Sequence, residues 1–267
     1  MINGSFSTTL SHFVSRLLHA NGFFLLRSSD MDYWSNLMES HGAWVNPHLY
    51  PGLFNDKSEF LALFEASGSF AATIAWRSLN TDSYADLLKT GHAWSPEPEA
   101  LGWTDLDPRG GEEISGFIHS RGGLWRRPDL KDSRLSWFLT SIQWSIALDE
   151  GVDFVVSQAK PDVADGGLTQ RLYGYAKSHM LPPHYYPWVG STFAAELVWS
   201  DAEAIRDEVS RRIRFLRQCH TKDLRSTVNS FERFQQSEKR PEAVRTPPVN
   251  ERKPFGPQLT GAHVSGT

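Results

Sequence analysis

Residues 112–160 constrain the possible fold more than any other part of this sequence. The stretch "DSRLSWFLTSIQWSIALDEG" predicts a helix that ends at Gly151. Strands are predicted on either side, at residues 112–127 and at residues 152–160, the second nearly all apolar, as in a strand buried on both faces. A strand, a helix and a strand in this order imply a right-handed crossover between two parallel strands. The apolar side of the helix consists of Leu135, Phe138, Leu139, Ile142, Ile146 and Leu148.

The remaining elements surround this unit. Residues 60–65 and 70–77 predict an antiparallel hairpin that turns at Ser67-Gly68. Since the crossover is parallel and the hairpin is antiparallel, we predict a mixed sheet with helices on both faces, of the α+β (α/β-like) class. Gly122-Gly123 predicts a bulge in the strand before the long helix. A last strand is predicted at residues 192–200, and further helices at residues 11–20, 31–42, 84–89, 165–180 and 202–218.

Composition and charge limit the kinds of protein that this chain can be. It has 267 residues, of which 40% are hydrophobic, so we expect one domain over residues 1–220 and a polar, disordered tail over residues 221–267. A net charge of -4 argues against a general nucleic-acid binder. Only one cysteine is present, Cys219, and no run is long and apolar enough for a membrane span. We therefore expect a soluble, cytoplasmic protein.

The exit of the strand, "LWRRPDLKDSRLSWF", together with the order of the elements, resembles the GNAT superfamily of acyl-CoA-dependent N-acyltransferases. In that family a loop similar to Arg-Gly-x-Gly-Leu-Gly opens the long helix. The resemblance covers residues 58–199, about half of the chain. Position by position, Pro128 and Asp129 match the turn, Lys131 the first basic residue, Asp132 and Arg134 the glycines, Leu135 the leucine and Ser136 the final small residue.

The resemblance implies an N-acyltransferase that moves an acyl group, most simply acetyl, from coenzyme A to an amine. Acetyl-CoA or another acyl-CoA would be the co-substrate. Its pyrophosphate would lie against the side chains of Lys131 and Arg134 and the amides of Leu135, Ser136 and Trp137, because a helix N-terminus favours an anion. Its pantetheine arm would pair with the backbone of Leu124, Trp125 and Arg126.

The resemblance also implies an acid and a base. Tyr173, in "RLYGYAKSHM", would protonate the departing thiolate, and Tyr175 is its rival. Glu113, with Glu112 beside it, is the candidate base, and His119 on the same predicted strand is the other.

Other interpretations follow from the same residues. The loop has no glycine, which favours an inactive GNAT-like module that binds a ligand or another protein without turnover. The basic stretch at residues 211–225 leaves open an adaptor that binds anionic partners. The histidines lack metal-ligand spacing, so no metal is expected. The sequence leaves the acceptor amine and the oligomeric state open.

Overall fold

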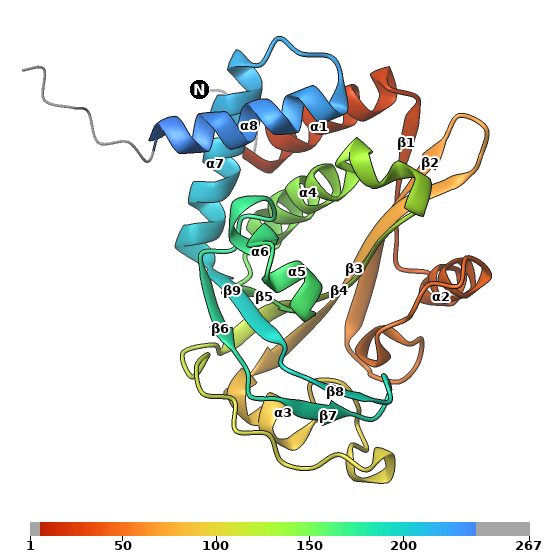
Figure 1. Ribbon diagram of the computed structural model, residues 1–267, viewed down its shortest axis with the longest axis vertical. Helices are drawn as coiled ribbons and strands as arrows, with labels where there is room; N and C mark the ends of the chain where they lie inside the picture. The colour runs from red at the N-terminus through yellow and green to blue at the C-terminus, as the bar shows by residue number, and fades with distance from the viewer. Residues whose placement is uncertain (1–5, 239–267) are drawn as a thin grey trace, which may run out of the picture.

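A seven-stranded sheet forms the centre of the computed structural model, which describes residues 6–238 (Figure 1). Its order is β1-β2-β3-β4-β5-β9-β6. The strands span Phe23–Ser28 (β1), Lys57–Glu65 (β2), Phe70–Thr81 (β3), Gly116–Arg126 (β4), Phe154–Ala159 (β5), Lys177–Met180 (β6) and Glu196–Asp201 (β9). Neighbouring strands are antiparallel except β4 and β5, which are parallel. The predicted mixed sheet and its crossover are confirmed.

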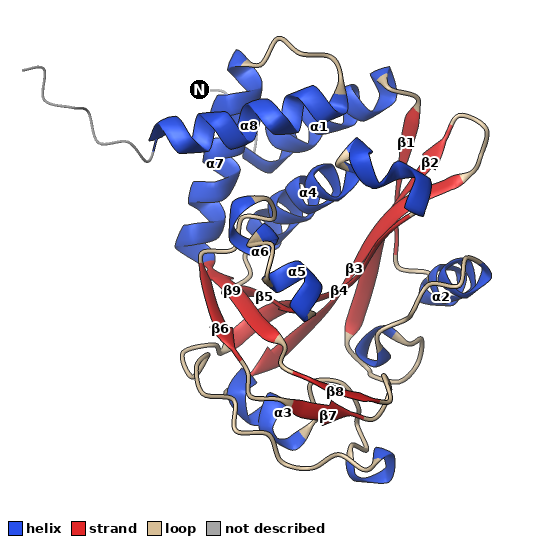
Figure 2. Cartoon of the chain, in the orientation of Figure 1, coloured by secondary structure: helices blue, strands red, loops and turns tan. Residues whose placement is uncertain are grey.

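Helices cover both faces of the sheet (Figure 2). The helices α1 (Phe6–Ala20), α4 (Leu135–Glu150), α7 (Ala202–Gln218) and α8 (Leu224–Glu238) bury the larger apolar cluster on one face. On the other face, α2 (Met31–Ser40) and the 3-10 turn η1 (Pro47–Leu49) cover β2 and β3. A third apolar cluster joins α3 (Tyr84–Thr90) to the small hairpin of β7 (His184–Tyr186) and β8 (Ser191–Phe193).

The long helix α4 is buried on all sides along most of its length, from Leu135 to Ala147. Its polar residues are therefore bonded inside the protein: the hydroxyls of Thr140 and Ser141 donate to the main-chain oxygen of Trp137 at 3.0 and 2.7 Å. Apolar residues on every face are expected of such a helix, because no side of it meets water. α4 thus fixes the end of β4 relative to the rest of the core.

β4 contains the predicted bulge. Between two pairs of the register, β4 advances by three positions, from Gly122 to Trp125, whereas β3 moves by only two, from Ala75 to Thr73. Gly123 has a φ of 58°, and a Cβ there would collide with the ring of Trp34. Because side chains alternate between the two faces of a sheet, one extra residue moves every later side chain of the strand to the opposite face. Arg121 and Arg126, five positions apart, therefore both face α4.

β4 and β5 separate soon after they meet. Their register runs over three pairs, from Ile118 with Phe154 to Ser120 with Val156. Beyond Ser120 the two strands diverge, and their backbone groups face an opening in the sheet instead of each other.

Two expectations from the sequence differ from the structure. The helix predicted at residues 165–180 is replaced by the short helix α6 (Leu168–Arg171) and by β6, because Gly167 precedes α6 with a φ of 58° and Gly174 follows it with a φ of 86°. The tail predicted at residues 221–267 begins with a helix: α8 packs Leu224, Thr227, Val228 and Phe231 into the core at helical spacing. Residues 239–267 lie outside the described part. β1 was not predicted.

Candidate active site

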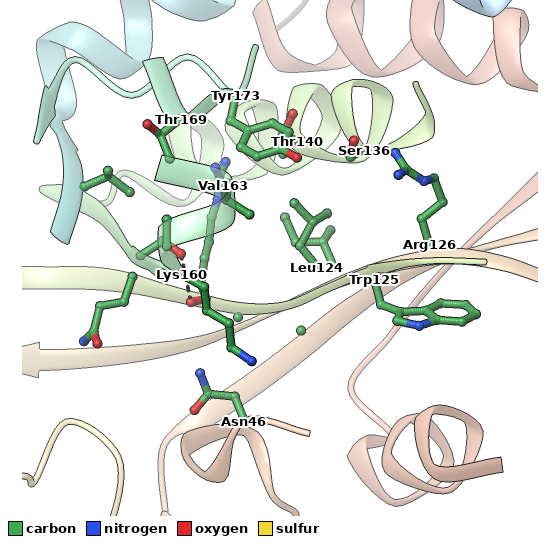
Figure 3. Close-up of a pocket in the computed structure, with 18 of the residues that line it drawn as sticks. Asn46, Leu124, Trp125, Arg126, Ser136, Thr140, Lys160, Val163, Thr169 and Tyr173 are labelled. Atoms are coloured by element: carbon green, nitrogen blue, oxygen red, sulfur yellow. Dashed lines mark hydrogen bonds between the residues drawn. The ribbon is translucent and has the colours of Figure 1, made fainter. Parts of the chain in front are cut away.

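A cavity of about 460 Å³ occupies the split between β4 and β5 (Figure 3). It lies where the strands have diverged, so β4 lines it from Arg121 to Arg126 and β5 lines it from Ser157 onward. The other walls come from α2 and the loop after it, from α4, and from α5 (Pro161–Ala164), α6 and the segments that flank them. These walls include Met38, Trp44, Asn46, Ser136, Thr140, Lys160, Val163, Thr169, Tyr173 and Tyr175.

One end of the cavity meets the N-terminus of α4. Arg134 caps this helix with φ 61°, and it is the only non-glycine residue of the described chain with a positive φ. The position where the resemblance places a glycine therefore keeps a glycine-like backbone while carrying an arginine. The amide of Trp137 donates to the oxygen of Arg134 at 3.0 Å. The amides of Leu135 and Ser136 lie in the first turn of α4, where no carbonyl of the helix can accept from them. They are therefore available to donate to a ligand.

Arg126 supplies a cation at the same end. Figure 3 shows its side chain extending from β4 toward Ser136, on the opposite side of the strand from Trp125. Burial lowers the pKa of Arg126, and Arg134 nearby lowers it further, against the opposing effects of Tyr173 and Asp132. Within residues 6–238 the buried Nε of Arg126 has no hydrogen-bond partner. A helix N-terminus beside a partly unsatisfied arginine is suited to an anion such as a phosphate.

The predicted coenzyme A residues divide into two groups. Leu124, Trp125, Arg126 and Ser136 line the cavity. The other four residues of the prediction do not line it: Lys131 is exposed, Arg134 is half-buried, and Leu135 and Trp137 are buried in the core. The 3-10 turn η3 (Pro128–Ser133) carries Lys131 on the protein surface, whereas Arg134 lies close enough to Arg126 to lower its pKa.

Both candidate acids lie at the cavity. Tyr173 lines it, as does Ser136; burial raises the pKa of Tyr173, and the neighbouring Ser136, Arg126 and Arg134 oppose that shift. The main-chain oxygen of Tyr173 accepts from Trp144 Nε1 at 2.7 Å, which anchors the residue to α4. Tyr175 also lines the cavity, and its hydroxyl accepts from Arg121 Nη1 at 3.1 Å.

The predicted bases Glu112 and Glu113 lie outside the cavity lining. Glu113 precedes β4 and accepts from Trp199 Nε1 at 3.0 Å and from Lys177 Nζ at 3.3 Å, at the β9–β6 side of the sheet. Glu112 accepts from the amide of Gly110 at 3.0 Å. The strand begins only at Gly116, so both carboxylates belong to the turn before it.

His119 is buried on the α4 side, outside the cavity lining. Gln143 Nε2 donates to its Nδ1 at 3.2 Å, so the ring carries its proton on Nε2 and donates it to Glu150 at 3.0 Å. Among the described residues that line the cavity there is no carboxylate and no imidazole. The basic side chains there belong to Arg121, Arg126 and Lys160.

Arg121, Lys160 and Asn46 are lining residues that sequence reasoning missed. Arg121 stands in a strand predicted from its apolar neighbours, and nothing local indicates that its side chain turns inward. Lys160 directly follows β5, at the carboxyl end of a strand beside a parallel neighbour, where ligands commonly bind. That position was a usable signal.

The comparisons with known proteins concern the fold. No protein-family model and no curated protein matches the sequence. Solved structures similar to this chain include an assigned GNAT-family acetyltransferase from Desulfovibrio desulfuricans, at 12% identity over 67% of this chain and 99% of that one, with a TM-score of 0.40. Another is FeeM, an N-acyl amino acid synthase from uncultured soil microbes, at 13% identity over 78% of this chain and 91% of that one, with a TM-score of 0.37.

A third is NAA60 from Arabidopsis thaliana in complex with acetyl-CoA, at 10% identity over 68% of this chain and 98% of that one, with a TM-score of 0.38. At these values the likenesses carry no argument about activity. The structure has the mixed sheet that the sequence predicted, and its parallel pair splits where the crossover helix begins. In the described residues no helix is long and apolar enough to cross a membrane, and no cluster of side chains could hold a metal.

Proposed function

We propose that this protein is an acyl-CoA-dependent N-acyltransferase whose acyl donor, most simply acetyl-CoA, binds in the cavity between β4 and β5. The observation that carries the proposal is the position of that cavity. It joins an open strand edge, suited to the amide groups of pantetheine, to a helix N-terminus and an arginine suited to pyrophosphate. Ser136 and Arg126 contact the pyrophosphate, and the backbone of Leu124 and Trp125 pairs with the pantetheine arm.

The reaction is a direct attack. The amine nitrogen forms a bond to the thioester carbonyl carbon, and the carbon–sulfur bond breaks as the tetrahedral intermediate collapses. Tyr173 donates its proton to the departing sulfur and recovers one from solvent. Because the described lining offers neither carboxylate nor imidazole, the amine enters uncharged and its surplus proton leaves to water. The reaction takes place in the cytoplasm, as the single cysteine leads us to expect.

Two measurements test the proposal. Calorimetry with acetyl-CoA and longer acyl-CoAs measures binding, and release of the free thiol with a panel of amines measures transfer. We expect micromolar binding and release that depends on the amine. Absence of binding at millimolar acyl-CoA would overturn the proposal.

The second candidate is a GNAT-like module that binds acyl-CoA without turnover. It is favoured by the lack of a base among the described lining residues. The same measurements separate the two candidates, because the module binds acyl-CoA but releases no thiol with any amine. The pH dependence of release adds a criterion: an enzyme without a base gains rate until the amine itself is deprotonated.

A further inference from the structure

The molecule buries an arginine at the cavity without an acidic partner. Arg121 comes from β4, is 4% exposed and lines the cavity. Its Nε donates to Gln143 Oε1, its Nη1 donates to the hydroxyl of Tyr175, and its guanidinium stacks 4.0 Å above the ring of Trp144. Within the described chain its Nη2 has no hydrogen-bond partner. All of its contacts are neutral.

A second buried arginine shows how the same protein satisfies this group when its role is structural. Arg212 of α7 is 0% exposed and pairs with Glu208 Oε1 at 2.6 Å. Its Nη2 donates to the main-chain oxygens of Leu172 and Tyr173 at 3.1 and 3.2 Å, and its Nη1 to that of Trp137 at 3.2 Å. Arg212 therefore has a counter-charge and bonds on every nitrogen, whereas Arg121 has neither.

A buried cation without an anion is strongly unfavourable, because desolvation is not compensated. Burial lowers the pKa of Arg121, Tyr175 opposes this shift, and Arg212 adds to it. The anion has to come from what occupies the cavity, since none of the described lining residues is a carboxylate.

The pyrophosphate of coenzyme A is not this anion. Its proposed position is at Arg126, which is five positions along β4 from Arg121, roughly 15 Å. Both side chains face α4 because of the bulge at Gly122-Gly123, so the cavity presents two separate cationic points along one wall. The first is suited to the nucleotide end of the donor, and the second lies deeper, beside Tyr175.

We propose that Arg121 binds a carboxylate of a substrate, carried either by the acyl chain of the donor or by the acceptor amine. This inference rests on the proposed acyl-CoA function and specifies its substrate class. The planar guanidinium suits a carboxylate, which accepts from Nη2 and from Nη1 when the latter turns from Tyr175. A neutral ligand of the same shape leaves Nη2 unsatisfied, so the site discriminates between the two.

Binding by the full-length protein tests this with two pairs of ligands. In the donor arm, succinyl-CoA is compared with butyryl-CoA, which has the same number of acyl carbons and no carboxylate. In the acceptor arm, a panel of L-amino acids is compared with the matching amino acid amides, titrated into protein saturated with coenzyme A. We expect at least about 10-fold tighter binding of the carboxylate member in one arm, and that arm identifies the source.

Variants test whether Arg121 is the residue responsible for the carboxylate preference. Arg121→Gln removes the charge, and we expect the ratio between the paired ligands to fall to within about 3-fold. Lys160→Gln removes the other cation near that part of the cavity, and Arg77→Gln removes a buried arginine that is outside its lining; both keep the ratio. If Arg121→Gln does not fold, the comparison of the paired ligands on the unaltered protein still shows whether the cavity prefers a carboxylate.

The outcomes separate this inference from the proposed function. Acyl-CoA binding with no carboxylate preference in either arm overturns the role of Arg121 and leaves the proposed function standing. A preference that survives in Arg121→Gln, or is lost in Lys160→Gln, also overturns it. If no acyl-CoA binds at all, the proposed function is wrong and the inference fails with it.

Discussion

The Nη2 atom of Arg212 donates to the main-chain oxygen of Tyr173 at 3.2 Å, so an arginine on α7 holds the candidate acid in place. The same guanidinium bonds the main-chain oxygen of Trp137 in the first turn of α4. One fully paired side chain therefore ties together the helix that opens the anion site and the segment that carries the tyrosine. This link makes the ion pair with Glu208 central to the geometry of the site.

We expect Glu208→Gln to lower the free energy of unfolding by about 3–5 kcal/mol, because it leaves the charge of Arg212 buried without its partner. Arg211→Gln is the matched control. Arg211 bonds the same carboxylate but is partly exposed, so its loss should cost less than about 1 kcal/mol. Chemical denaturation measures both. Equal losses in the two variants would contradict this assignment.

Tyr173→Phe should lower the turnover of acyl-CoA at least about 100-fold and leave the Kd for acetyl-CoA within about 2-fold, because the lost hydroxyl acts on the leaving sulfur and not on the bound donor. Tyr175→Phe is the comparison, since both hydroxyls belong to residues that line the cavity. Steady-state rates and calorimetry on both variants identify the acid. A large loss in Tyr175→Phe alone would transfer the role to Tyr175.

Arg126→Gln should weaken acetyl-CoA binding about 10-fold or more and reduce its dependence on salt, because one charge-assisted contact to the pyrophosphate is removed. Lys131→Gln removes an exposed cation of η3 that is outside the cavity lining, and it should change the Kd less than about 2-fold. Calorimetry at two salt concentrations gives both numbers. The reverse order would restore the role that the sequence resemblance assigned to Lys131.

Arg134→Gly should raise the free energy of unfolding by about 1 kcal/mol relative to Arg134→Ala, because only glycine adopts a φ of 61° without a penalty from Cβ. Alanine is the right reference, since it removes the arginine side chain and retains the strain. Thermal unfolding compares the two variants. Equal stability would mean that the backbone at this position relaxes once the arginine is gone.

The protein should lose stability in acid partly through Glu150. The hydrogen bond from His119, with the charges of Arg27 and Lys57, lowers the pKa of Glu150 from 4.5 to about 2, although burial opposes the shift. The folded-state pKa is the lower one, so the stabilisation is complete above about pH 4.5 and is lost as the pH falls toward 2. The free energy of unfolding, measured at several pH values across this range, should change less with pH in Glu150→Gln than in the unaltered protein. An unchanged slope would rule out this contribution.

Much of the fold could be predicted because its signals are local. The helix α4 and the strand β5 follow from apolar spacing, and Gly122-Gly123 indicates the bulge. β1 has the sequence Phe-Phe-Leu-Leu-Arg-Ser, which does not alternate, and its pairing with β2 depends on residues far along the chain. The segment at residues 165–180 has helical spacing, but Gly174 packs against Glu208, a contact that no local pattern records.

The site was harder to predict than the fold. The resemblance brought attention to Arg126, Ser136 and Tyr173, which line the cavity. It also pointed to Glu113, whose partner Trp199 is 86 residues away in sequence. Arg121 could not be found in this way, because its importance comes from what surrounds it in space. A buried arginine is identified as unsatisfied only when its neighbours in the fold are known.

The split between β4 and β5 also bears on how this protein avoids aggregation. An unpaired strand edge invites pairing with other chains, and proteins usually protect such edges with charge, bulges or a covering element. Here the free edge of β4 beyond Ser120 lies inside the molecule, walled by α4 and by the segments around α5 and α6. We expect a slender extended ligand to fit beside this edge more readily than a strand of another protein, whose side chains project from both faces. The fold thus keeps a hydrogen-bonding edge available in a crowded cell while restricting which molecules can use it.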